Sequence, residues 1–189
     1  MGKRLRVQRR GRGGHHAKAS KMNKTAPSKY PTITTEGLHG IVKSMEHEPG
    51  RGAPLAYVEF QPGNGYYISA IEGMSLNMPI EVGVGAVPRV GNVLHLKDIP
   101  EGTMVCNIEL RPNDGGKMAR SSGAFATVIA HTDNHTTVRL PSKRIVRISK
   151  NARATIGIIS GGGRKERPFM KAGEKHHMKK AKGHKYPTA

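Results

Sequence analysis

The chain has 189 residues, with 32 lysines and arginines against 13 aspartates and glutamates, which gives a formal net charge of +19. A single cysteine, Cys106, excludes an internal disulfide framework, and no apolar run approaches the roughly 20 residues that a membrane-spanning helix needs. With 24 glycines, 12 prolines, no tryptophan and 4% aromatic residues, the composition favours short strands joined by tight turns over a helical protein.

The positive charge is concentrated at the two ends of the chain. Residues 1–30 contain ten lysines and arginines and no acid, and residues 164–189 contain nine against two acids, whereas the segment between them is close to neutral. Contact with phosphates removes the repulsion within such ends, so this pattern is typical of a protein that lies against a polyanion. A purely solubilising role of the ends is the alternative.

Residues 1–33 form the first predicted unit, a basic N-terminal arm. Leu5 and Val7 are the only apolar side chains of segment 2–14, so we expect the arm to order only on binding. No apolar stretch follows the basic residues, as a secretory signal would require, and we expect a cytoplasmic protein. A transit peptide is the alternative, and the many glycines and few hydroxyl residues disfavour it.

Residues 34–112 are predicted to form a first small barrel, because short apolar segments are separated here by turn-forming residues. In Pro54–Phe60, Ala56, Val58 and Phe60 share one face, and the Asn64-Gly65 pair indicates a hairpin turn. The expected strands are Leu38–Met45, Pro54–Phe60, Tyr66–Ile71, Val93–Leu96 and Thr103–Leu110. In the last of these, strict alternation places Met104, Cys106, Ile108 and Leu110 inward.

Residues 113–163 are predicted to form a second barrel, after a hinge over Arg111–Gly123. Its four expected strands are Ala124–His131, His135–Leu140, Lys143–Ile148 and Arg153–Ile159, with Ala154, Ile156 and Ile158 facing inward. Strands this short fit an SH3-like barrel better than a sandwich. Residues 164–189 form a basic C-terminal extension, in which Pro168 and Gly173 argue against a long helix.

Basic residues within the body are a second sign of phosphate binding. Arg51 lies in a Pro-Gly-Arg-Gly turn, and Lys117 and Arg120 lie in the hinge. Segment 139–153 has no acid and six basic residues: Arg139, Lys143, Arg144, Arg147, Lys150 and Arg153. A cationic stripe indicates contact with a nucleic acid, and ordinary exposed charge on strand edges is the alternative.

The sequence offers little for catalysis or metal binding. His131 and His135 are four residues apart, but Asp133-Asn134 between them predicts a hairpin rather than a helix, so no metal site is expected. Cys106 alternates with core residues and is interpreted as a small buried hydrophobe. No phosphate-binding loop, carboxylate pair or nucleophile triad is found, so we expect neither an enzyme nor a cofactor.

Four long segments carry a resemblance to a known family. They are GKRLRVQRRGRGG at residues 2–14, HEPGRGAPLAYVEF at 47–60, IPEGTMVCNIELRPNDGGKMARSSGAFATVIA at 99–130 and RATIGIISGGGRKERPFMKAGEKHHMKKAKGHKYP at 153–187. In this order they resemble the universal large-subunit ribosomal protein L-two family, in its archaeal and eukaryotic branch. The family usually continues into a run of Val-Ala-Met-Asn-Pro-Val-Asp-His-Pro, which has no counterpart before Ala189.

The resemblance implies an all-β fold, in which an OB-fold barrel is followed by an SH3-like barrel. It implies a structural protein that binds large-subunit rRNA, supports assembly near the peptidyl transferase centre and subunit association, and is not catalytic. The expected partners are large-subunit rRNA and neighbouring ribosomal proteins, with no membrane and no small-molecule substrate. Mg²⁺ or K⁺ shared with rRNA phosphates is compatible with this function.

The family's RNA-binding arginines fall by motif on Arg51 and Arg120, and the charge pattern adds the other candidates. The expected rRNA-binding residues are Lys3, Arg4, Arg6, Arg9, Arg10, Arg12, Arg51, Lys117, Arg120, Arg144, Arg147, Arg153, Arg164, Lys165, Lys171, Lys175, Lys179, Lys180 and Lys182. Two other classes compete with this hypothesis. One is a free nucleic-acid chaperone that coats polyanions without specificity, and the other is an RNA-modifying enzyme, which lacks an acid–base constellation here.

Overall fold

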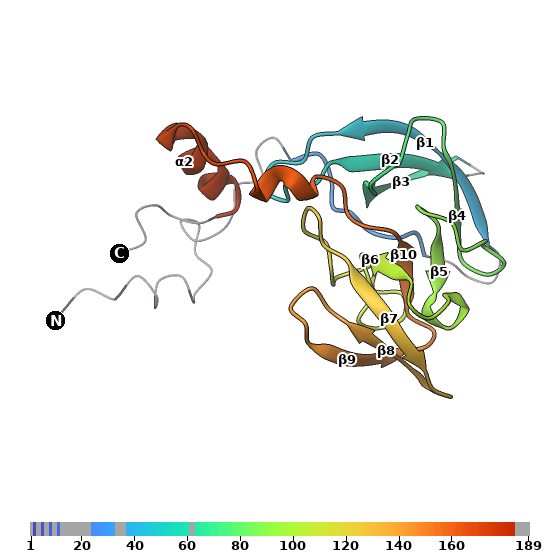
Figure 1. The fold of residues 1–189 in the computed structure, drawn as a ribbon. Coiled ribbons are helices and arrows are strands. Elements are labelled where there is room, and N and C mark those ends of the chain that lie inside the picture. The colour runs from blue at the N-terminus through green and yellow to red at the C-terminus, as the bar shows by residue number, and fades with distance from the viewer. Residues whose placement is uncertain are drawn as a thin grey trace.

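The computed structural model describes residues 24–32, 37–60 and 63–183, together with the isolated positions 2, 5, 8 and 11. These residues form a 10-stranded sheet in the order β3-β2-β1-β4-β5-β10-β6-β7-β8-β9, and an α-helix, α2. Figure 1 shows the sheet folded into two halves, β1 to β4 above and β5 to β10 below. The predicted all-β class is confirmed, and the arrangement is consistent with an OB-fold barrel followed by an SH3-like barrel.

The first half is built around the long strand β1 (Leu38–Glu46). It pairs antiparallel with β2 (Leu55–Phe60) on one side and with β4 (Pro79–Val82) on the other, and β3 (Asn64–Ser69) pairs with β2. The pairing of β1 with β2 shifts register between Val42 and Ser44, as at a β-bulge, and the residues of β1 that pair with β4 precede this shift. The core of this half includes Val42, Ala56, Val58, Phe60 and Ile80, which confirms the face predicted for β2.

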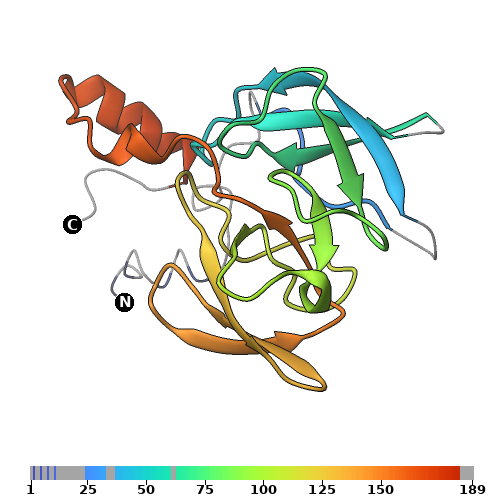
Figure 2. The same cartoon turned by 45° about the vertical axis from the view of Figure 1, so that its right-hand side comes forward.

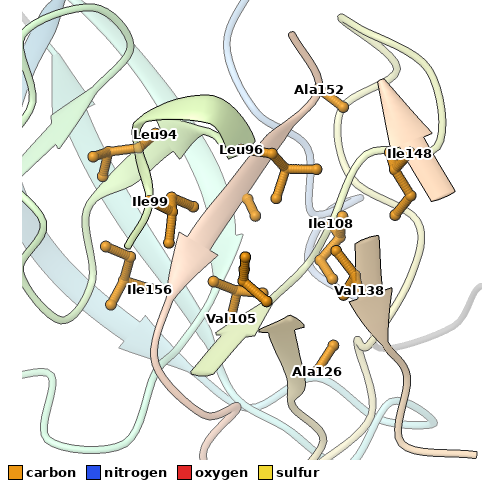
Figure 3. Close-up of a cluster of buried hydrophobic side chains, with 12 residues drawn as sticks. Leu94, Leu96, Ile99, Val105, Ile108, Ala126, Val138, Ile148, Ala152 and Ile156 are labelled. Carbon is orange, nitrogen blue, oxygen red and sulfur yellow. The ribbon is translucent and has the colours of Figure 1, made fainter. Parts of the chain in front are cut away.

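The second half encloses a separate core. Its strands are β5 (Val93–His95), β6 (Met104–Cys106), β7 (Ala126–His131), β8 (His135–Arg139), β9 (Ile145–Ser149) and β10 (Arg153–Ile156). Strand β10 pairs with β5 and β6, and β6 leads into the antiparallel run β7-β8-β9. Figure 3 shows the buried aliphatic side chains that these elements direct toward one another, among them Leu94, Val105, Ile108, Val138 and Ile148.

The change of core lies earlier in the chain than expected. Segments 93–96 and 103–110 were assigned to the first barrel, but β5 and β6 pair with β10, and Leu94 and Val105 pack in the second core. Val93 still packs in the first core, and Cys106 belongs to a small third cluster. Segment 111–123 is therefore a long connection within the second half. The strand β4, which precedes the change, was not predicted, because its four residues are too short to show a period.

The β2–β3 hairpin is confirmed, but its turn precedes the Asn64-Gly65 pair at which it was predicted. Asn64 and Gly65 belong to β3, where Gly65 faces Glu59, and the positive φ of the turn is found at Gly63, at 73°. A side chain at position 65 would collide with the ring of Tyr57. The glycine is thus required by the close approach of an aromatic ring rather than by the turn.

Two predicted inward faces are partly wrong. Cys106 and Ile108 are buried as predicted, but Met104 and Leu110 are exposed. Asn107, with a φ of 47°, interrupts the extended strand, and residues 105–109 are all buried without alternation. In the last segment, Ala154 and Ile156 are buried as predicted, but after Gly157, with a φ of 118°, Ile159 is buried in place of Ile158.

The C-terminal extension contains the ten-residue helix α2 (Ala172–Ala181), where the sequence argued only against a long helix. Pro168 precedes the N-cap residue Lys171, and Gly173 lies in the first turn, so neither interrupts the helix. Figure 2 shows α2 beside the junction of the two halves. A Cβ on Gly50 would lie 2.7 Å from the Ala181 carbonyl oxygen, so the helix end contacts the β1–β2 turn. Among the described residues, no helix has the length and apolar character to span a bilayer.

Candidate nucleic-acid interface

Residues 24–32, which end the N-terminal arm, cross the junction of the two halves, and we call them the strap. The Lys29 and Tyr30 amides donate to the carbonyl oxygens of Tyr67 and Gly115, at 3.0 and 3.2 Å. The Tyr30 side chain is buried, and its hydroxyl donates to the Asn107 carbonyl at 2.7 Å and lies 2.6 Å from Thr155 Oγ1. Burial raises the pKa of this hydroxyl far above its usual range, so it stays protonated.

Arg153 is the clear exception among the predicted rRNA-binding residues. Its guanidinium is buried, with Nη2 2.7 Å from Glu109 Oε1, and its Nη1 donates to the Pro31 carbonyl at 2.8 Å. The charge is fully satisfied inside the protein, so the expectation of phosphate contact was wrong for this residue. Arg153 instead fixes the strap to β10.

Arg51 and Arg120 meet beside the strap. Arg51 Nη1 lies 3.4 Å from Ser69 Oγ, and Arg120 donates to the carbonyl oxygens of Gly116 and Ser28 at 2.9 and 2.7 Å. Burial lowers the pKa of both guanidinium groups, and the charge of Arg51 lowers that of Arg120 further. Neither forms an ion pair with a carboxylate of the described segments, and Arg120 Nε is buried without a hydrogen-bond partner there.

Arg164 extends this group toward α2. Its Nε and Nη2 lie 3.3 and 2.9 Å from Ser122 Oγ, and its Nη1 lies 3.8 Å from the sulfur of Met178 in the helix. A Cβ on Gly52, next to Arg51, would lie 2.6 Å from the Arg164 guanidinium carbon. Arg51, Arg120 and Arg164, which we call the junction arginines, therefore gather where both halves, the strap and α2 meet.

The remaining basic residues of the body lie on the outer surface of the second half. Thr137 pairs with Arg147, and Arg139 pairs with Ile145, so alternation places Arg139 and Arg147 on the same outer face of β8 and β9. Arg144 is exposed in the turn between these strands. Lys117 is also exposed, although its Nζ lies 3.5 Å from Asp114 Oδ2.

The basic side chains of the C-terminal extension are carried largely by α2. Lys175, Lys179 and Lys182 follow helical spacing and share one side of it, Lys171 occupies the N-cap position without a capping side-chain bond, and Lys180 lies in its last turn. Lys165 ends a short 3-10 helix, Gly162–Lys165. The arm residues Lys3, Arg4, Arg6, Arg9, Arg10 and Arg12 lie outside the described residues, and their role stays a prediction.

The titratable groups of the body serve structural contacts. His131 has its Nε2 2.8 Å from the Ile99 carbonyl oxygen and its Nδ1 3.1 Å from Thr136 Oγ1, so both ring nitrogens are used within the fold. Cys106 is buried as predicted, and burial raises the pKa of its thiol to about 12. No group of three potential metal ligands comes together within the described segments.

The sequence did not point to Tyr30 and Glu109, which hold the strap. A signal existed for Glu109, because an acid within an otherwise apolar alternating segment needs a partner if it is buried. Glu109 accepts the amide protons of Asn113 and Gly115 as well as the Arg153 guanidinium. No local pattern identified Arg153 as its partner.

Comparison with known proteins shows two matching family models. The RNA-binding N-terminal domain of Ribosomal Proteins L2 matches residues 3–81, and the C-terminal domain of Ribosomal Proteins L2 matches residues 89–188. The boundary between the two models, between residues 81 and 89, lies close to the change of core, which follows Val93.

Similar proteins are found among archaeal large ribosomal subunit proteins named uL2. The chain is 48% identical to that of Thermofilum pendens, over 100% of this chain and 78% of the relative. The corresponding identities are 49% for Pyrobaculum calidifontis and 44% for Korarchaeum cryptofilum, each over 100% of this chain and 77% of the relative.

Proposed function

The chain belongs to the ribosomal protein L2 family, and on that premise we propose how its residues bind large-subunit rRNA. The protein is a structural component of the large ribosomal subunit and not an enzyme, and it acts where the ribosome acts, in the cytoplasm. Its partners are rRNA and other ribosomal proteins.

The junction arginines carry the proposal. Arg51 and Arg120 hold two half-buried positive charges close together. The carboxylates of Glu48 and Asp114 act on them only at a distance, and neither arginine forms an ion pair within the described residues. Such a pair of positive charges is unfavourable unless an anion approaches, and guanidinium groups bind phosphate through paired hydrogen bonds. We therefore assign the junction as the primary phosphate contact of the body.

The other basic groups extend this contact in three directions. The outer face of β8 and β9 presents Arg139 and Arg147, α2 presents its lysines, and the strap fixes the point at which the N-terminal arm leaves the body. The A-form major groove is too narrow for side chains, so specificity should come from RNA shape and junction geometry. In this role the protein would support assembly near the peptidyl transferase centre and the association of the subunits.

Substitution at the junction tests this assignment. Arg51→Gln or Arg120→Gln should weaken binding to large-subunit rRNA roughly 10-fold, because each removes a charge-assisted contact. The slope of log affinity against log salt concentration should become shallower by about one. Lys43→Gln is the matched control, since its Nζ already lies 3.4 Å from Glu59 Oε2. Equal losses in all three variants, measured by filter binding over a range of KCl, would refute a special role of the junction.

Competition separates this function from that of a free polyanion chaperone. A ribosomal protein should prefer one region of large-subunit rRNA, whereas a chaperone should bind duplex DNA and rRNA about equally. Crosslinking from positions 51 and 120 would map the preferred region. Recovery of the protein in the free soluble pool alone, and never in large subunits prepared in high magnesium, would contradict the ribosomal function.

A further inference from the structure

A hollow on the outer side of the second half shares only Arg139 with the contacts described so far. It lies between the start of β7 and the turn that joins β8 to β9, and its volume is about 710 Å³. That volume falls within the range of about 300–1,000 Å³ typical of small-ligand sites. Arg139 and Lys143 line it, together with Phe125 and Thr127, and none of its lining residues is acidic.

Both walls of the hollow are held by backbone hydrogen bonds. On one side the Gly123 amide donates to the Ile159 carbonyl at 2.8 Å. On the other, the amides of Lys143 and Leu140 donate to the carbonyls of Leu140 and Arg144 at 2.8 and 2.9 Å. The hollow is thus preformed, which lowers the entropic cost of binding.

Phe125 is exposed at the rim, although the protein has only three phenylalanines. Phe125 directly precedes β7, and it is exposed whereas its neighbour Ala126 is buried in the core of the second half. The residue is 39% exposed and lines the hollow, so a ligand in the hollow would contact it. Aromatic rings at this kind of site stack with nucleic-acid bases regardless of sequence.

Two cationic side chains line the hollow beside Phe125: Arg139 at the end of β8 and Lys143 in the turn that follows. Arg139 is the register partner of Thr127 and lies on the same outer face. Lys143 has a φ of 66°, whereas three of the other four non-glycine residues with positive φ are asparagines. A lysine is less suited than asparagine or glycine to this backbone, and such an exception suggests a functional side chain.

We propose that this hollow binds one unpaired nucleotide of an RNA strand, with its base on Phe125 and its phosphate between Arg139 and Lys143. An unpaired base is required because a paired base has no free face to stack on a protein side chain. The proposal rests on the proposed function as an rRNA-binding protein, and it adds a contact with a base to the phosphate contacts of the junction.

A tryptophan reporter tests the base contact directly, because the chain has no tryptophan of its own. In the full-length Phe125→Trp variant, a single-stranded RNA octamer should quench the indole fluorescence in a saturable manner, as stacking does. Inorganic polyphosphate, which has the charge without bases, and a fully paired RNA duplex should leave it nearly unchanged. Leu76→Trp is the control, since Leu76 is exposed in the first half.

Affinity provides a second measurement. Phe125→Ala should weaken binding of the octamer about 5- to 100-fold, the range expected for the loss of one base stack, while Phe125→Tyr should stay within about twofold of the unchanged protein. Lys143→Gln should weaken binding of both the octamer and polyphosphate. Unchanged midpoints of urea unfolding would show that the variants remain folded.

The outcomes separate this inference from the proposed function. If the unchanged protein binds large-subunit rRNA but the octamer does not quench the Phe125→Trp variant, the nucleotide site is refuted and rRNA binding stands. Equal quenching by polyphosphate and the octamer would show that the hollow binds anions through charge alone, and this result would also refute the nucleotide site. If the unchanged protein fails to bind rRNA while the octamer still quenches, the proposed function is refuted and the nucleotide site stands.

Discussion

At the scale of single residues, Glu109 holds several segments together. Its two oxygens accept bonds from the Arg153 guanidinium and backbone and from the amides of Asn113 and Gly115. Arg153 in turn bonds the Pro31 carbonyl and lies 5.4 Å from the centre of the Tyr30 ring. The pair thus links β10, the loop after β6 and the strap in a region without water access, where an unpaired charge is costly.

Removal of one partner should therefore destabilise the whole protein. We expect Glu109→Ala to lower the free energy of unfolding by about 3–5 kcal/mol, because it leaves the Arg153 charge buried without a counter-charge. Glu59→Ala is the matched control, since it breaks the exposed pair with Lys43 and should cost less than about 1 kcal/mol. Equal losses for the two variants in urea unfolding would contradict a structural role of the buried pair.

At the scale of elements, α2 is marginal as a helix by itself. It has ten residues, none of them buried, and no side chain caps its first turn. Isolated helices of this length are poorly stable in water, so its stability depends on contacts at its ends. The contact of Ala181 with the Gly50 turn and that of Met178 with Arg164 supply them.

Gly173→Ala should stabilise α2. No atom lies within 4 Å of a Cβ built at this position, and alanine is preferred over glycine in a helix by up to about 1 kcal/mol. Amide hydrogen exchange in residues 175–180 should slow down by up to about fivefold. Gly65→Ala provides the contrasting case, because its Cβ would collide with Tyr57, so it should destabilise the first half. Faster exchange in the Gly173→Ala variant would refute α2 as described.

At the scale of the whole molecule, the strap ties the two halves together. The strap contacts the first half through Tyr67 and the second through Gly115 and Arg153. A second contact joins Ile71 to Ile159, beside a small shared core that includes Ala53 and Cys106. The junction arginines and α2 therefore lie close to one another where the halves meet.

Deletion of residues 1–23 should separate the contribution of the arm from that of the body. The deletion removes eight lysines and arginines but keeps the strap. We expect the slope of log rRNA affinity against log salt concentration to become shallower by up to about 6, because up to eight phosphate contacts are lost. The junction should still bind. Filter binding at several KCl concentrations would measure this slope. An unchanged slope would show that the arm does not contact phosphates.

The sequence by itself determined the properties that depend on local pattern. Strands β1, β2, β5, β7 and β8 lie close to their predicted positions, because alternation and turn residues act over a few neighbours. The charged ends, the resemblance to the family and the choice of Arg51 and Arg120 as candidates were likewise available from the sequence alone.

The tertiary structure decided the assignments that depend on distant partners. Glu109 and Arg153 are 44 residues apart and Arg153 and Pro31 are 122 apart, so no local period could show that Arg153 is buried rather than bound to RNA. The same holds for β5 and β6, which join the second core through pairing with β10. The hollow beside Phe125 also exists only because the turn after β8 folds back against the start of β7. Local periodicity sets which face of a segment is apolar, but only long-range packing sets what that face meets.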